Sequence, residues 1–178
     1  MVSRDDGGTC VARIVETEAY GGPEDRASHA RAGQTPRTKP MFGAPGLAYI
    51  YLVYGLHECL NVVAHTTGSA GAVLLRAVEP VSGQELMRRR RGGTAEPDVR
   101  LASGPGRLCR ALGVDRALSG HDLGIGRRLW LEPPDEDGAI AAQGVASGPR
   151  VGVAYAGREW ASRPWRFWLR GHPSVSRP

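Results

Sequence analysis

The sequence predicts a single α+β domain built mainly on an antiparallel sheet. Three runs rich in β-branched and aromatic residues follow one another between glycine-containing turns, at 48–53, 60–64 and 72–78. Two short helical segments come after them, and each ends at glycine. The chain has 178 residues, enough for one hydrophobic core, and shows no internal repeat or long linker. We therefore expect one domain over residues 1–178.

The first predicted strand covers residues 10–20. Alternate side chains of a strand share a face, which groups Ile14, Glu16, Glu18 and Tyr20. Two rises along the strand separate the carboxylates by roughly 6.6 Å. This spacing fits a pair that cleaves glycosidic bonds with inversion, or one general base with a bystander. It also fits two solvated glutamates on an exposed edge strand. On spacing alone, this last interpretation is favoured over a catalytic one.

A long loop, residues 21–46, follows this strand, and loops of this length usually carry function. We expect Asp25 to cap a short helical turn at 27–29. Arg31, Arg37 and Lys39 are basic residues of this loop.

The strands at 48–53 and 60–64 form a predicted hairpin whose tip is 54–58. Tyr49 and Tyr51 share a face of the first strand, and Tyr54 lies at the tip. These rings could pack in the core with their hydroxyls bonded at the surface. A protruding tip that bears Tyr54 and Leu56 also has the form of the apolar wedges that enter DNA between base steps.

The remaining elements are short. The strand at 72–78 ends at Glu79-Pro80-Val81, and a helix over 83–91 ends at two glycines and carries four consecutive arginines. Such a run is typical of a solvated helix face with weak attraction for phosphate. We expect a second helix at 107–112, with Ser103 as its N-cap. Short strands are predicted at 129–131, 150–155 and 166–170. The glycine-rich start of the second helix, at 103–107, lacks the full sequence pattern of a phosphate-binding loop, so we do not expect binding of nucleoside triphosphates.

Composition limits the partners and the compartment. The formal net charge is +5, and Lys39 is the only lysine beside many arginines. Arginine suits phosphate recognition, although genome base composition can also favour it over lysine. The three cysteines and five histidines show no disulfide framework or metal-ligand spacing, so we expect a metal-free protein without cofactor. No apolar stretch is long enough to span a membrane, and the polar segment 1–8 does not resemble a secretory signal. We therefore expect the protein in the cytoplasm, associated with the nucleoid if the source is prokaryotic.

Several segments together carry a more specific signal. The longest run from Arg13 to Asp25 and from Tyr49 to Gly55, and shorter ones are His29, 34–37, 41–42, Asn61, 73–80, 103–105, 108–109, 150–152 and 163–167. In this order they resemble the alkyladenine (3-methyladenine) DNA glycosylase family, over roughly residues 11–175. The resemblance implies a curved, mainly antiparallel sheet with a protruding hairpin and peripheral helices.

The resemblance also implies a function and a set of roles. Members of this family hydrolyse the N-glycosidic bond of alkylated or deaminated purines after base flipping, so we expect a monomer that acts on double-stranded DNA and leaves an abasic site. Glu18 is implied as the general base and Tyr54 as the intercalating side chain. The residues implied to bind the flipped base are Tyr20, His29, Tyr51 and Asn61. Those implied to contact DNA are Thr35, Arg37, Met41, Leu56 and Arg76. A lyase step is not expected, because Lys39 is the only candidate amine.

The amino-terminal end departs from the family pattern. Family members have a helix and a strand ahead of the Arg13 block, whereas only twelve residues precede it here. Either the start is misassigned or the protein is truncated. We expect the shortfall to expose core surface and to leave the strand of Glu18 at a frayed edge. A DNA-binding relic without catalysis is therefore an alternative, and a carbohydrate-cleaving enzyme that uses Glu16 and Glu18 is another.

Overall fold

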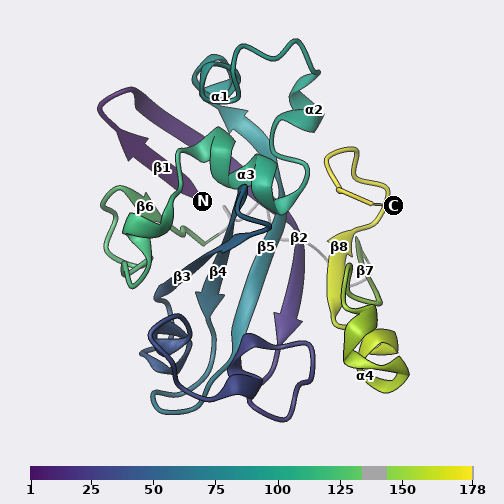
Figure 1. Ribbon diagram of the computed structural model, residues 1–178. Coiled ribbons are helices and arrows are strands. Elements are labelled where there is room, and N and C mark those ends of the chain that lie inside the picture. Colours follow the sequence, from purple (N-terminus) through teal and green to yellow (C-terminus); the bar gives the residue numbers. More distant parts are fainter. Residues whose placement is uncertain (134–143, 178) are drawn as a thin grey trace.

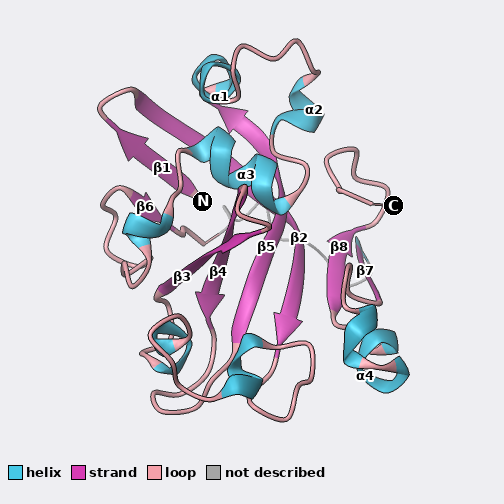
Figure 2. Cartoon of the chain, in the orientation of Figure 1, coloured by secondary structure: helices cyan, strands magenta, loops and turns pink. Residues whose placement is uncertain are grey.

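The computed structural model describes residues 1–133 and 144–177, which form one antiparallel sheet with short helices around it (Figures 1 and 2). The strands are β1 (Val2–Asp5), β2 (Gly8–Tyr20), β3 (Ala48–Val53), β4 (His57–Val63), β5 (Ala72–Ser82), β6 (Leu129–Trp130), β7 (Val145–Gly148) and β8 (Arg166–Leu169). The α-helices are α1 (Gln84–Arg90), α2 (Asp98–Leu101), α3 (Pro105–Leu112) and α4 (Arg158–Ser162). Short 3-10 helices are η1 (His29–Ala32), η2 (Lys39–Phe42), η3 (Arg116–Leu118) and η6 (Ala154–Ala156). The predicted α+β class is confirmed.

The sheet runs in the order β3-β4-β5-β2-β1-β6, and β8 pairs with β2 and with β7. Every one of these pairings is antiparallel. The hairpin of β3 and β4 is close to its predicted bounds, since β3 matches them and β4 begins three residues earlier, at His57. Its turn has positive φ at Tyr54 (52°) and Gly55 (68°), and Leu56 N–H donates to Val53 O at 3.1 Å.

β2 lies inside the sheet, so the expectation of a frayed edge at Glu18 is wrong. β5 covers one side of β2 from Val11 to Tyr20. On the other side β1 pairs with its first part and β8 with its last part, where Glu18 faces Arg166. The segment ahead of β2 is not merely polar: Val2 is buried and belongs to β1. Pairing on both sides satisfies the backbone groups that an edge strand leaves open.

Two irregularities shape the middle of β2 and β5. The register passes from Ile14 opposite Val78 to Glu16 opposite Ala77, and then to Thr17 opposite Leu75. Val15 is thus an extra residue on β2, and Arg76 is an extra residue on β5. Bulges of this kind redirect side chains and are frequent beside active sites. Here they separate Ile14, which packs on the main core, from the carboxylates that follow it.

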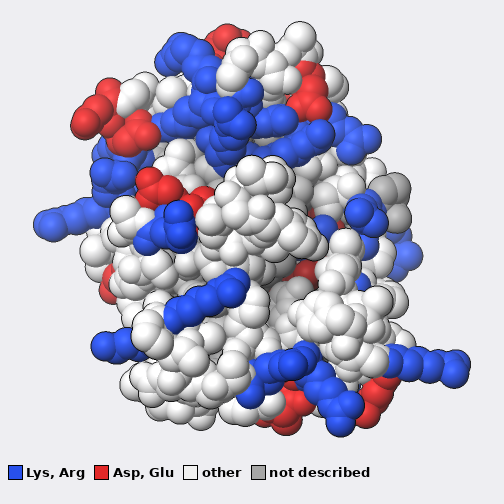
Figure 3. Space-filling view, viewed as in Figure 1, with Lys and Arg blue, Asp and Glu red and all other residues white. Residues whose placement is uncertain are grey.

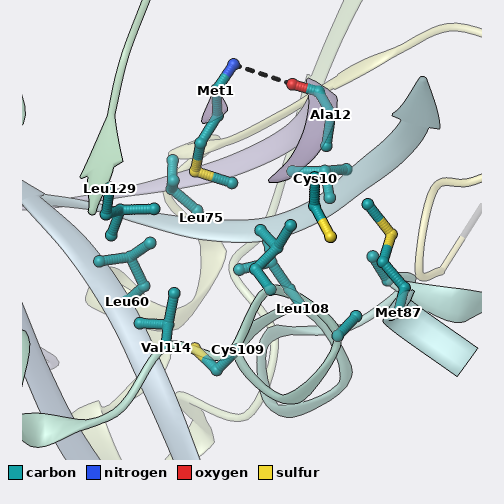
Figure 4. Packing of buried hydrophobic residues seen from close by; sticks show 14 of the residues in the cluster. Met1, Cys10, Ala12, Leu60, Leu75, Met87, Leu108, Cys109, Val114 and Leu129 are labelled. Carbon is teal, nitrogen blue, oxygen red and sulfur yellow. Dashed lines mark hydrogen bonds between the residues drawn. The ribbon is translucent and has the colours of Figure 1, made fainter. Parts of the chain in front are cut away.

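The main core lies between the sheet and helices α1, α2 and α3 (Figure 4). α3 packs on β4 and β5, because its apolar residues fall on one side: Leu108, Cys109, Ala111 and Leu112 are all buried. Met1 lies in the same cluster, and its amino group donates to Ala12 O at 2.9 Å. Cys10, Cys59 and Cys109 are free and buried.

Two local predictions are wrong, and a third is correct only in part. The N-cap of α3 is Gly104, because Ser103 bridges to Ala77 and donates its hydroxyl to Val175 O at 3.5 Å. Residues 150–155 form a turn and η6 rather than a strand, since Gly152 has φ of 77° and β7 takes the place beside β8. The 3-10 helix η1 begins at His29 with Ser28 as its N-cap, whereas Asp25 accepts from Ala27 N–H at 2.9 Å in the turn before it.

Candidate active site

A cavity of about 600 Å³ opens between the β3–β4 hairpin, the 21–46 loop and the segment at 151–155. Eight of the eleven residues singled out from the sequence line it, namely Tyr20, His29, Arg37, Met41, Tyr51, Tyr54, Asn61 and Arg76. Three do not: Glu18 lies behind the wall, while Thr35 and Leu56 are farther out on the loop and the hairpin. Residues distant in the sequence are therefore gathered around one hollow.

Glu18 is fully buried, yet its three partners line the cavity. Its Oε2 accepts from Tyr20 Oη at 2.9 Å. Its Oε1 accepts from Val151 N–H at 2.7 Å and lies 3.3 Å from Arg76 Nη1. These donors compensate a carboxylate that is withdrawn from water. A carboxylate offers about four lone-pair positions, so one remains after these three contacts.

Glu16 is held differently and does not face the cavity. Its Oε1 accepts from Arg76 Nε at 3.0 Å and lies 3.1 Å from Arg166 Nε, and its Oε2 accepts from Ser176 N–H at 2.7 Å. Both glutamates are buried, so the interpretation as solvated residues on an exposed edge is wrong. Two guanidinium groups and a backbone amide occupy Glu16, which leaves Glu18 as the carboxylate next to the cavity. The paired-carboxylate interpretation is therefore not favoured.

Aromatic rings form the cavity walls. The ring centroids of His29 and Tyr51 are 4.5 Å apart with an edge-to-face angle of 81°, and those of Tyr49 and Tyr51 are 5.5 Å apart. His29 Nδ1 is hydrogen-bonded to Tyr49 Oη at 3.0 Å. Tyr20 forms another wall, and its hydroxyl is fixed by Glu18. Such an arrangement suits a flat ligand that stacks.

Burial dominates the titration of His29. Burial, with a smaller contribution from the charge of Arg37, lowers the pKa of His29 to about 4. Burial also raises the pKa of Tyr49 to about 12. At neutral pH the cavity therefore contains an uncharged imidazole beside an uncharged phenol.

His29 gives a testable pH dependence of stability. The unfolded chain, with an ordinary histidine pKa of about 6.5, binds the proton more readily than the folded protein does. The free energy of unfolding should therefore fall as the pH is lowered from about 6.5 to about 4. The variant His29→Asn should lose this part of the decrease, as urea unfolding across the pH range would show. Identical pH profiles for the two proteins would contradict a buried neutral His29.

Asn61 is fixed in the floor of the cavity. Its Nδ2 donates to Tyr49 O at 3.0 Å and to Cys59 O at 3.3 Å. Both amide hydrogens are thus used by the backbone of β3 and β4, and the side chain cannot swing away from a ligand. Its position was predicted from the sequence, whereas its anchoring was not.

The hairpin carries two exposed apolar side chains. Tyr54 is 88% exposed and Leu56 is 78% exposed. Tyr54 also has a left-handed backbone conformation, which is uncommon for a residue other than glycine. A large aromatic side chain held out in solvent at a strained position indicates a contact surface rather than a folding role.

Figure 3 shows the distribution of charge on the face seen in Figure 1. Basic side chains gather over the region of α1 to α3 and again at the lower edge, and the surface between them is hollowed and largely uncharged. The arginine run on α1 is less free than the sequence indicated. Arg88 pairs with Asp98, Arg90 with Asp5 and Arg91 with Glu96.

Comparison with known proteins decides the family. The family model described as methylpurine-DNA glycosylase matches residues 1–173. The chain belongs to the methylpurine-DNA glycosylase family. The resemblance stated from the sequence is therefore confirmed.

Individual relatives agree with the methylpurine-DNA glycosylase assignment. A protein of Anaeromyxobacter dehalogenans strain 2CP-1 named putative 3-methyladenine DNA glycosylase is 51% identical over 179 aligned positions, which cover 100% of this chain and 76% of the relative. The DNA-3-methyladenine glycosylases of Mus musculus and Homo sapiens are 45% and 46% identical. These alignments cover 96% and 92% of this chain but only 53% and 56% of the two mammalian proteins.

Some features of this methylpurine-DNA glycosylase site were not predicted. Val151 donates to Glu18 from 133 positions away, and the buried pair of Arg150 and Asp25 holds the chain next to it, with Arg150 Nη1 2.6 Å from Asp25 Oδ2. A periodic sequence pattern cannot show that one backbone N–H, here that of Val151, will donate to a distant side chain. In residues 1–133 and 144–177 no group of three potential ligands is placed to hold a metal ion, and no helix is long and apolar enough to cross a membrane.

Proposed function

We propose that the protein is a base-excision-repair DNA glycosylase that hydrolyses the N-glycosidic bond of alkylated or deaminated purines and leaves an abasic site. One juxtaposition carries the proposal. A buried carboxylate, Glu18, is held by Arg76 and Val151 directly behind an aromatic cavity, and an exposed tyrosine, Tyr54, stands at the mouth of that cavity. Family membership and the names of the relatives support the same activity.

The chemistry requires a water, a base and a site for the departing purine. A base in the cavity would stack on Tyr20, His29 and Tyr51, whose rings attract a purine that alkylation has made cationic. The remaining lone-pair position of Glu18 can accept a proton from a water that attacks C1′ as the base leaves. Arg76 and Val151 fix the carboxylate in this orientation.

The proposed hydrolysis does not pass through a covalent intermediate between the sugar and a lysine amine. Lys39 is the only lysine of the chain and does not line the cavity. An imine with the sugar is therefore not available, and hydrolysis ends at the abasic site. The base must leave the stack first, which costs a few kcal/mol and costs less for a damaged base.

Incubation with a damaged duplex tests the function. The substrate is a duplex oligonucleotide with a single hypoxanthine or 1,N6-ethenoadenine. After incubation the DNA is treated with alkali, which breaks the strand at an abasic site. We expect breaks at the lesion and none in the undamaged duplex. Tight binding without breaks would instead identify a catalytically inactive DNA-binding relic. The main ground for that alternative has weakened, because β2 is paired on both sides.

Tyr54 should be required for binding to damaged duplex. We propose that its ring fills the gap left by the flipped nucleotide, a contact of the kind that contributes about 1–3 kcal/mol. Tyr54→Ala should weaken binding by about that amount and slow excision, while Tyr54→Phe should retain both. The side chain is 88% exposed, so neither change should alter the melting temperature greatly. Excision by Tyr54→Ala at the wild-type rate would exclude the wedge role.

Asn61 is proposed to reject normal guanine. Its amide is anchored to the backbone of β3 and β4, and we propose that the fixed side chain blocks the position of the exocyclic amine of guanine. Asn61→Ser should raise the excision of guanine relative to hypoxanthine in otherwise identical duplexes. If the ratio of the two rates does not change in the folded variant, selectivity arises elsewhere.

Arg37, Thr35 and Leu56 are proposed to bind the duplex, whereas Met41 is buried and is proposed to support the cavity wall. Arg37 lies at the cavity rim with its guanidinium 5.6 Å from the centroid of the Tyr51 ring, and Met41 lines the cavity from η2. Thr35 is bonded to Thr38 in the same loop, at 3.0 Å between the hydroxyl oxygens. Leu56 is exposed beside Tyr54 on the hairpin. Arg37, Thr35 and Leu56 would support the strand around the extruded nucleotide, while Arg76, which is buried and paired with Glu16 and Glu18, would act from the cavity wall.

A further inference from the structure

A second hollow adjoins the mouth of the cavity. It has a volume of about 420 Å³ and is lined by Arg26, Arg31, Tyr155, Ala156 and Gly157. We call it the Arg26–Arg31 groove. Tyr155 lines both this groove and the base cavity, so its ring forms the wall between them. Tyr155 is 67% exposed, which places a second aromatic side chain at the mouth in addition to Tyr54.

The groove is built on a fixed support. Tyr155 donates its hydroxyl to Ala27 O at 3.1 Å, and Arg31 donates to Arg26 O at 3.1 Å. Beneath them Ala27, Val153, Ala156 and Trp160 pack in a small apolar cluster. The two segments that carry the groove, 26–31 and 155–157, are therefore joined to each other and present their polar groups in a defined arrangement.

The charge of the groove is not neutralised within the described part of the chain. Arg26 and Arg31 are exposed, and neither makes an ion pair with residues 1–133 or 144–177. The adjacent carboxylate, Asp25, is buried and committed to Arg150. The next one, Glu24, accepts from Gly22 N–H at 3.2 Å. By contrast, three arginines of the α1 run are paired with carboxylates.

We propose that the Arg26–Arg31 groove binds phosphates of the DNA backbone beside the extruded nucleotide. Guanidinium groups suit phosphate oxygens, and Tyr155 lines both hollows, so the groove is next to the opening through which a base would enter the cavity. Each of the two exposed guanidinium groups in the groove can bind two phosphate oxygens at once. This inference rests on the proposed function, because it takes the partner to be DNA.

Salt dependence of DNA binding provides the test. The variant Arg26→Gln/Arg31→Gln removes two positive charges from exposed positions. The matched control, Arg89→Gln/Arg100→Gln, removes two exposed charges from α1 and α2. Affinity for an undamaged duplex and for one with a single hypoxanthine is measured from low to moderate salt. Each phosphate contact contributes about 0.9 to the slope of log affinity against log salt, so the groove variant should lose up to about two units of slope.

The outcomes separate this inference from the function. The groove variant should lose clearly more slope than the control. A loss equal to or smaller than that of the control would overturn the inference, even if the wild type excises hypoxanthine. Failure of the wild type to excise any lesion would overturn the function, while the slope comparison would still be readable on duplex DNA.

Discussion

Glu18→Gln is expected to abolish most excision while leaving damaged DNA bound. The amide has nearly the same shape as the carboxylate but cannot take a proton from the attacking water. Loss of a general base typically costs about 10²–10⁴-fold in rate. Single-turnover excision of hypoxanthine from a duplex should fall by that factor, and the affinity for the same duplex should change much less.

Glu16→Gln is the matched control for this prediction. Glu16 lies two residues away on β2, is equally buried, and also binds Arg76. Because it contacts Arg166 and Ser176 rather than the cavity, its loss should lower stability more than chemistry. Per folded molecule, Glu16→Gln should retain most of the rate. Equal rate losses in the two variants would contradict a specific role of Glu18 in the chemical step.

Removal of the Asp25 carboxylate should cause the largest loss of stability. The pair with Arg150 is completely buried, and the guanidinium also lies 4.7 Å from the ring centroid of Tyr20 and 5.0 Å from that of Trp165. Burial alone would raise the pKa of Asp25, but hydrogen bonds from Arg150 and from the N–H groups of Ala27 and Gly21 outweigh it and keep the pKa low. Asp25→Ala leaves the Arg150 charge buried without its partner, which costs about 3–5 kcal/mol.

Urea unfolding of three variants would measure this loss. Asp25→Ala and Arg150→Met should each be strongly destabilised, because each leaves one buried charge. The double variant should be less destabilised than the sum of the single changes, since no unpaired charge remains. Additive losses would show that the two side chains do not stabilise each other. Because Val151 follows Arg150 and donates to Glu18, excision should fall in these variants as well.

Local patterns account for what the sequence predicted well. Alternating aromatic and β-branched residues with a glycine turn define the β3–β4 hairpin, whose tip presents Tyr54 as expected. Similarly, glycine stops mark the ends of α1 and α3 near their observed positions. The cavity residues on these elements followed from the family resemblance, which supplied their roles as expectations.

The missed features depend on contacts between distant segments. Strand alternation could not anticipate the extra residues Val15 and Arg76, which bring one guanidinium to both glutamates. Nor could it show that β8 would protect the end of β2, because that pairing joins positions about 150 residues apart in the chain. Residues 150–155 had strand-like composition, yet Arg150 is bound to Asp25 and Gly152 turns the backbone. Tertiary interactions overrode the local preference there.

The most direct test of the account is a crystal structure of Glu18→Gln bound to a duplex with one 1,N6-ethenoadenine. We predict the lesion base in the cavity against Tyr20, His29 and Tyr51, its C1′ facing position 18, and the Tyr54 ring in the gap in the duplex. A lesion that remains stacked in the helix, or one in the cavity whose C1′ points away from position 18, would contradict the account.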